Sequence, residues 1–416
     1  MDVDVRSKER IRLSRVEGDL HIQDGGIVEV EGSELVVNGI IVCHGDAEII
    51  GSVVAQGLDG RQPSEGFRFT RRGSRVNVHG NLSAEDFVKV KGLLAVRGSL
   101  TARDTDVGGT LEVGGNVSCE SLDIGGTLEA RGDMKAGSIS VGGTAHIGGK
   151  AEAEKISVGG RIQIEGISKV ETLKCGGKVI IGGGEVEGIK VGGTFESTGE
   201  LRFEKIDVGG TVTLRAAGEG EKIDVGGRLE ALSNLQAEEV DVGGTVRVAG
   251  NMEGESIDVG GTIRVGGDLN LTEELHVGGT IRISGFGRLG SLVVGGSIEA
   301  EGAVIEEDAE IGGEIITKKG LKAEAIRLGR KGSAVGPLIA ENIRIGREAE
   351  VEDLYADYLD MEHDSSARNL YVKQARIGRG CRIHGVVRYT DSIDIERDVV
   401  LSEKPEKVES LPTPPL

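Results

Sequence analysis

The chain of 416 residues has almost no aromatic residues, with no Trp, four Tyr and six Phe, or 2% of the sequence. An ordinary globular core for a chain of this length would contain many more rings, so we expect a narrow core of aliphatic side chains. Basic residues are outnumbered, because 49 Lys and Arg stand beside 69 Asp and Glu, which gives a net charge of −20. This charge repels nucleic acid, and we expect no nucleic-acid partner.

Signals for a membrane, a secretory route or a metal are also lacking. No apolar run approaches the length of a membrane span, and the first residues, MDVDVRSKERIRLS, contain no apolar stretch of a secretion signal. The cysteines are far apart and do not have the spacing of metal ligands; they are Cys43, Cys119, Cys175 and Cys381. We therefore expect a cytoplasmic protein without a cofactor or a metal.

Glycine, by contrast, is abundant, with 70 residues, and many of them form a regular series of Gly-Gly pairs. Nearly every pair follows Val or Ile, and successive pairs are usually about 17 residues apart, as between KIDVGGTVTL and KIDVGGRLEA. The first glycines of the pairs are Gly108, Gly125, Gly142, Gly159, Gly176, Gly192, Gly209, Gly226, Gly243, Gly260, Gly278, Gly295 and Gly312. A fixed period of this kind indicates a repeat architecture.

Each repeat has the pattern of two short strands. Ile206 and Val208 alternate with a polar residue before one glycine pair, and Val212 and Leu214 do so after it. Alternation with period two is typical of strands with one buried face. Two or three strands in a repeat of this length fit one turn of a solenoid whose strands pair with the next turn. The sequence thus predicts an all-β, right-handed parallel β-helix with about 17 residues per turn.

We expect the glycine pairs to form corners, because glycine adopts the positive φ values of a sharp turn at low cost. Equivalent positions of successive repeats must then stack in columns. Cys175 stands before its glycine pair, where the other repeats have Val or Ile. It is therefore predicted to be a core residue rather than a reactive thiol.

The predicted β-helix spans residues 16–401 and follows an N-terminal segment at 1–15. Irregular turns are expected at 350–390, either to close the solenoid or to form an interface, because all the tyrosines occur there; they are Tyr355, Tyr358, Tyr371 and Tyr389. Residues 402–416 hold four of the six prolines and are predicted to be a disordered tail or a short extended strap.

A second break in the repeat, at 58–75, is predicted to be an inserted loop. It contains the only concentrated group of basic and aromatic residues, among them Phe67, Arg68, Phe69, Arg71 and Arg72. Two interpretations stay open: a plain loop between turns, and a contact with an anionic membrane or with another protein.

The ends of the predicted solenoid are candidate assembly surfaces. An end turn lacks one neighbour and exposes unpaired backbone groups together with part of the apolar core. Neither end has the pattern of a capping helix, so copies of the chain are expected to stack end to end. The residues predicted at these ends are Val16, Leu20, Ile22, Ile393, Ile395, Val399 and Leu401.

With its regular glycine-bearing turns, few aromatics and proline-containing tail, the chain resembles the bactofilins, a family of polymer-forming cytoskeletal proteins. The C-terminal stretch ARIGRGCRIHGVVRYTDSIDIERDVVLSEKPEKVESLPTPPL is similar to the ends of archaeal members. The resemblance implies a right-handed β-helix that polymerises through its terminal turns into filaments without nucleotide. It also implies a structural scaffold, with the chain itself as partner, rather than an enzyme.

The alternative function is a hexapeptide-repeat acyltransferase that uses coenzyme A thioesters. Some turns do carry a second glycine pair six residues after the first. The third six-residue unit that a turn of such an enzyme would have is missing. Such an enzyme needs a histidine beside an acceptor loop, whereas His146 and His276 lie inside regular repeats. A cation site is a further open alternative at four aspartates that occupy one position in successive repeats; they are Asp207, Asp224, Asp241 and Asp258.

Overall fold

The computed structural model describes residues 1–61 and 74–416, and every regular element in these ranges is a β-strand. The strands pair in parallel with their counterparts one turn away, as Thr110 pairs with Thr127 and Met134 with Ala151. This arrangement confirms the predicted all-β parallel β-helix with about 17 residues per turn. The chain divides into two compact units, the first unit at Met1–Gly209 and the second unit at Gly210–Leu416.

A regular turn of the first unit contains a four-residue strand, a corner, an eight-residue strand and a second corner. Leu128 is fully buried between Leu111 and Ala145 of the neighbouring turns, while Thr127 and Glu129 face solvent, as the alternating pattern predicts. The regular strands are β12 (Thr110–Val113), β13 (Val117–Ile124), β14 (Thr127–Ala130), β15 (Met134–Val141), β16 (Thr144–Ile147), β17 (Ala151–Val158), β18 (Arg161–Ile164), β19 (Ser168–Cys175), β20 (Lys178–Ile181), β21 (Gly184–Val191), β22 (Thr194–Ser197) and β23 (Leu201–Val208).

The Gly-Gly pairs form the corners that lead into the four-residue strands, but the expected reason for glycine is wrong. None of the described glycines of these pairs has a positive φ. Instead, a Cβ atom at Gly125 would lie 2.2 Å from the carbonyl oxygen of Gly108, and one at Gly142 would lie 2.3 Å from that of Gly125. Each corner rests on the backbone of the corner before it, so a side chain has no room there.

The second corner of the turn is held by side-chain amides and carboxylates. Asn116 Oδ1 accepts a hydrogen bond from the backbone N–H of Asp133 (2.9 Å), and Asp133 Oδ1 accepts one from Lys150 (2.8 Å). The second unit repeats this contact between Asn234 and the N–H of Asn251 (3.0 Å). These bonds occupy backbone donors of the next turn at a point where the strand ladder is interrupted.

The first turns of the first unit are less regular, and strand β6 runs further than predicted. Leu58, which was assigned to the inserted loop, is fully buried in register between Ile41 and Val88, because its apolar side chain fits that core column. The insertion therefore begins after Gly60. The strands here are β1 (Val3–Val5), β2 (Arg10–Leu13), β3 (Arg15–Val16), β4 (Leu20–Ile22), β5 (Gly26–Cys43), β6 (Ala47–Gly60), β7 (Arg75–Val78), β8 (Leu82–Val90), β9 (Leu93–Val96), β10 (Leu100–Thr101) and β11 (Asp104–Val107).

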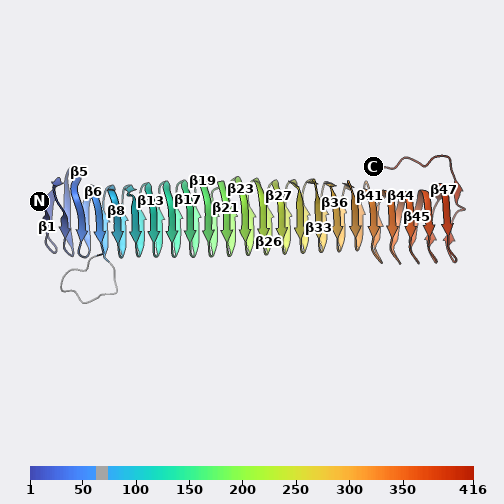
Figure 1. Ribbon diagram of the computed structural model, residues 1–416, viewed down its shortest axis with the longest axis horizontal. Coiled ribbons are helices and arrows are strands. Elements are labelled where there is room, and N and C mark those ends of the chain that lie inside the picture. The colour runs from blue at the N-terminus through green and yellow to red at the C-terminus, as the bar shows by residue number, and fades with distance from the viewer. Residues whose placement is uncertain (62–73) are drawn as a thin grey trace. The chain divides into compact units, whose positions relative to one another are not determined.

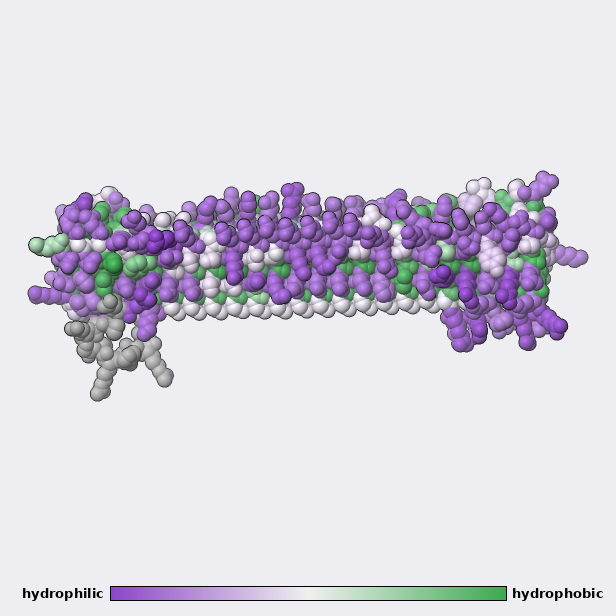
Figure 2. Space-filling model, viewed as in Figure 1, coloured by the Kyte–Doolittle hydropathy of each residue, from purple (hydrophilic) through white to green (hydrophobic). Residues whose placement is uncertain are grey.

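The second unit begins with the same pattern of strands and corners as the regular turns of the first unit. In Figure 2 the visible face carries mainly hydrophilic side chains, with apolar ones between them. Its strands before residue 333 are β24 (Thr211–Leu214), β25 (Gly218–Val225), β26 (Arg228–Ala231), β27 (Leu235–Val242), β28 (Thr245–Val248), β29 (Met252–Gly254), β30 (Ser256–Val259), β31 (Thr262–Val265), β32 (Leu269–Leu271), β33 (Glu274–Val277), β34 (Thr280–Ile283), β35 (Phe286–Leu289), β36 (Ser291–Val294), β37 (Ser297–Ala300), β38 (Gly302–Ile305), β39 (Asp308–Ile311), β40 (Glu314–Thr317) and β41 (Leu321–Leu328).

The turns from residue 330 to 401, here named the late turns, continue the parallel ladder. Irregular turns were predicted at 350–390, and the turns in this range depart from the common repeat in length and, at one point, in register. Leu338 pairs with Leu354 and Leu354 with Leu370, so each of these two turns is one residue shorter than the common repeat. A register shift occurs between Val372 and Gln374, within the pairing of β45 with β47. The strands are β42 (Ser333–Val335), β43 (Leu338–Ile345), β44 (Glu350–Met361), β45 (Ser366–Ile377), β46 (Arg382–Ile383), β47 (Val387–Ile395) and β48 (Val400–Leu401).

The sequence predicted either a disordered tail or a short extended strap for residues 402–416. In the structure these residues form an extended strap. Strand β49 (Glu406–Lys407) pairs with Arg388 and Tyr389 of β47, and the N–H of Val408 donates to the carbonyl of Tyr389 (2.9 Å). The chain then turns back past β45 and β44 (Figure 1). Leu411 and Leu416 are half-buried in this segment.

Candidate functional site

The outer face of the last turn, formed by β47 and β48, exposes apolar residues whose partners in the preceding turn are buried. Ile395 pairs with Ile377 and is 37% exposed, whereas Ile377 is fully buried. Leu401 is half-buried, although its partner Ile383 is 1% exposed. Ile393 and Val399 are likewise half-buried. All four were predicted at this end, and the structure brings them together on one turn.

The backbone of this last turn is also partly unpaired. Residues 392–395 of β47 pair with β45 on one side, while β49 covers only Arg388 and Tyr389 on the other. Within the described ranges no strand continues the ladder beyond Ile395. Val400, which was not predicted at this end, is 59% exposed on β48, where it pairs with the exposed Arg382 and therefore faces outward from the turn.

The N-terminal end is placed differently from the prediction. Leu20 and Ile22 are fully buried, because β1 lies over them and pairs Val3 with Leu20. Val16 belongs to the first turn but is only 2% exposed. The apolar residues that remain half-buried on the first turn are Val3, Ile11 and Leu13.

Three of the tyrosines lie on β44 and β45, before the last turn, and Tyr389 lies on β47 of the last turn, where it pairs with β49. Tyr355 and Tyr371 stack on successive strands, with ring centroids 4.8 Å apart, and line a groove beside the tail residues Leu411 to Pro414. Burial raises the pKa of Tyr355, with a smaller contribution from Tyr371. These rings therefore belong to the side of the late turns, where the strap lies.

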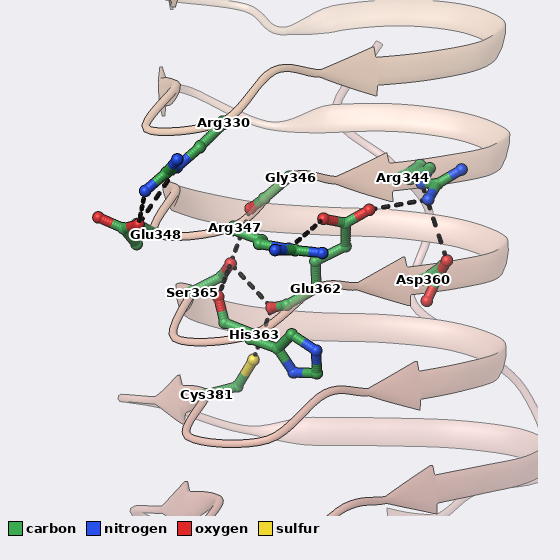
Figure 3. A network of polar contacts seen from close by, with 10 residues as sticks. All are labelled: Arg330, Arg344, Gly346, Arg347, Glu348, Asp360, Glu362, His363, Ser365 and Cys381. Carbon is green, nitrogen blue, oxygen red and sulfur yellow. Dashed lines mark hydrogen bonds and ion pairs between the residues drawn. The ribbon is translucent and has the colours of Figure 1, made fainter.

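A network of charged residues connects the corners of the late turns (Figure 3). Glu362 accepts a hydrogen bond from Arg344 (2.8 Å) and forms an ion pair with Arg347 (3.4 Å). The bond from Arg344 lowers the pKa of the Glu362 carboxyl group. The buried hydroxyl of Ser365 lies 2.8 Å from the carbonyl oxygen of Gly346. These contacts join neighbouring turns, which makes the network structural.

The cysteines do not form a reactive site. Cys175 is 5% exposed in register between Val158 and Val191, which confirms it as a core residue. Burial raises the pKa of Cys43 to about 12, with a smaller effect of Asp59. Thiolate forms of such groups are rare at neutral pH.

The histidines and aspartates considered from the sequence lie on strand surfaces. His146 is 3.0 Å from Glu165, and His276 is 3.7 Å from Asp258. Asp241 is the register partner of Asp224 and Asp258, while Asp207 accepts a hydrogen bond from Lys190 (2.9 Å). Among the residues that the structure describes, no cluster of His, Cys, Asp or Glu could hold a metal ion.

The predicted partner residues Phe67, Arg68, Phe69, Arg71 and Arg72 lie outside the described residues. The part of the chain that is described contains no helix with the length and apolarity to cross a membrane. Comparison with known proteins found no matching family model, curated protein or solved structure.

Proposed function

We propose that this protein is a structural scaffold of the cytoplasm whose copies associate through end turns of the β-helix, without nucleotide and without enzymatic activity. The proposal follows the resemblance to the bactofilins. The observation that carries it is the exposure of Ile395, which is 37% exposed on the last turn while its column partner Ile377 is fully buried.

An end turn of this kind favours the addition of a further turn from another copy of the chain. Addition of a strand beside residues 392–395 would satisfy backbone donors and acceptors that the ladder leaves unpaired, and would cover Ile393 and Ile395. Each buried apolar side chain of this size contributes about 1.5–3 kcal/mol. The first turn of another copy, with Val3 and Ile11 half-buried, offers a surface of the same chemistry.

The net charge of −20 opposes association and makes it depend on salt. Since the Debye length falls from about 30 Å at 0.01 M salt to about 8 Å at 0.15 M, added salt should promote assembly. Sedimentation velocity and negative-stain microscopy of the purified chain across this range would measure the effect.

The matched variants are Ile395→Asp and Ile167→Asp, because both replace an exposed isoleucine and add one charge; Ile167 is 62% exposed in the first unit, away from the end turns. We expect Ile395→Asp to abolish the salt-dependent assembly and Ile167→Asp to leave it intact. A chain that stays monomeric at every salt concentration, or equal assembly by both variants, would contradict the proposal.

A further inference from the structure

The first unit has a long groove on its side, at the same strand positions that the tail covers in the second unit. The groove runs from Val36 to Glu187 and has a volume of about 1560 Å³. In the strands β8, β13, β15, β17 and β19 it follows the second, third and fourth residues. In β15 these residues are Lys135, Ala136 and Gly137. In β43 of the second unit the corresponding residues are Ile339, Ala340 and Glu341, and they face Leu411 to Pro414.

The floors of the two grooves match. Small residues dominate the third position in both, with Ala102 and Ala136 in the first unit and Ala323, Ala340 and Ala356 in the second. These alanines are at most 9% exposed and lie at the bottom of the groove, between two flanking rows of more exposed side chains. The repeated alanines are the signal in the sequence that marks this groove.

One wall of each groove is acidic. In the first unit it is formed largely by Glu85, Glu120, Glu154, Glu171 and Glu187, and in the second by Glu306, Glu324, Glu341 and Asp357. The segment that lies against the second wall, Leu-Pro-Thr-Pro-Pro-Leu at 411–416, has no charged side chain. An uncharged extended segment avoids the repulsion that an acidic one would meet there.

The opposite wall differs between the units. The second unit presents the stacked rings of Tyr355 and Tyr371. The first unit presents apolar residues only at one end, with Val36 and the 36% exposed Val54, and serines, lysines and glutamates further along. Proline-containing segments suit apolar surfaces such as these, because their extended conformation is already formed before binding.

From this match we propose that the groove of the first unit binds an extended, uncharged, proline-containing segment of another protein. Residues 411–414 of this chain lie against the groove of its own second unit, which leaves the groove of the first unit for a segment of another protein. The occupant therefore comes from a partner, and the scaffold gains a docking site distinct from its end turns. A segment of about a dozen extended residues would cover the groove at about 3.1 Å per residue.

Residues 410–416, SLPTPPL, made as an amidated and fluorescently labelled peptide, are the probe for this groove. Titration of the full chain, followed by fluorescence anisotropy, should show saturable binding. The matched variants are Ser118→Arg in the groove wall and Ser140→Arg on the same kind of strand but outside the groove; both serines are exposed. We expect Ser118→Arg to weaken binding at least tenfold and Ser140→Arg to leave it unchanged.

Cys119 provides a second measurement, because it lines the groove and is half-buried, whereas the other three cysteines are buried. Burial raises the pKa of Cys119 to about 12, with a smaller effect of Asp104, so alkylation will be slow and is best followed at mildly alkaline pH. Bound peptide should slow alkylation of Cys119 severalfold. This result separates binding in the first unit from displacement of the tail in the second.

Absence of binding, equal binding by Ser118→Arg and Ser140→Arg, or binding that leaves the alkylation rate of Cys119 unchanged would overturn the inference. Sedimentation velocity of the unlabelled chain tests whether a second copy of the chain occupies the groove. If Ser118→Arg reduces self-association, the groove belongs to a second copy and the assignment to a partner is wrong. Failure of Ile395→Asp to block assembly, in contrast, would concern only the end turns.

Discussion

The regular turns of the first unit and the late turns of the second unit both stack in parallel, but they form their corners in different ways. In the regular turns a glycine pair rests on the glycine pair of the turn before, and a Cβ atom would meet a backbone carbonyl. In the late turns a residue with positive φ forms the corner; these residues are Lys331, Glu348, Asp364, Gly380 and Asp398, with φ between 59° and 74°.

The two corners impose different demands on the sequence. The first excludes every side chain, whatever its conformation, because the neighbouring backbone occupies the space. The second accepts side chains at a cost in backbone conformation, and in return the corner can carry charge, as Arg330 and Glu348 do in an ion pair of 2.6 Å. Close backbone stacking persists in the late turns at Gly346 and Gly378, and ion pairs between turns are added to it.

The largest effect that separates the two corners is expected for Gly142→Ala. The new Cβ atom would lie 2.3 Å from the carbonyl oxygen of Gly125, and neither backbone can move without disturbing the next turn. We expect a loss of local stability of about 2–3 kcal/mol, in the range of overpacked core variants. Hydrogen exchange of the segment 134–147, measured by mass spectrometry, reports this local opening.

Gly188→Ala is the matched control in the same unit. A Cβ atom there has only the carbonyl oxygen of Glu171 near it, at 3.6 Å, and the φ of Gly188 is not positive. The variant should be neutral or stabilising by about 0.4–1 kcal/mol, since alanine reduces the freedom of the unfolded chain. Equal effects of the two variants would show that contact between stacked corners does not explain the glycine pairs.

Acid should weaken the late turns more than the regular turns. Hydrogen bonds from arginines lower the pKa of carboxyl groups there, namely Glu348, Asp353, Glu362 and Glu396. A carboxylate whose pKa falls on folding stabilises the folded chain above its unfolded pKa of about 4, and this contribution is lost as the pH falls below it. We expect the melting temperature of the late turns to fall by several degrees between pH 6 and pH 3.5.

Tyrosine fluorescence measures this loss selectively, because the chain has no Trp and its only tyrosines lie between residues 355 and 389. Circular dichroism, which reports on all strands, should shift less, since acid also reduces the net charge of −20. Arg368→Gln removes the donor that lies 2.6 Å from Asp353 and should reduce the pH dependence of the tyrosine signal. A tyrosine transition that is independent of pH would exclude a stabilising role of these pairs.

The repeat pattern was sufficient to predict the β-helix, because alternation and a constant repeat length each follow from strands that stack in register. It also located Ile393, Ile395, Val399 and Leu401 on the last turn. The pattern could not predict that β1 covers Leu20 and Ile22, since a three-residue strand such as Val3–Val5 has too little alternation to be recognised. The groove was missed because an alanine column looks like ordinary core in a single repeat.

The smallest effect is expected at the late corner, for Asp364→Gly. Asp364 has a φ of 61° and is exposed, and the equivalent residue one turn later is Gly380. Glycine relieves the left-handed strain but loses more entropy on folding, so the two terms nearly cancel, to within about 0.5 kcal/mol. Asp364→Val should instead cost about 1–2 kcal/mol, because a β-branched residue disfavours this conformation. Thermal unfolding followed by tyrosine fluorescence measures both variants. If Asp364→Gly were as destabilising as Gly142→Ala, the late corners would depend on their side chains, and the distinction between the two kinds of corner would fail.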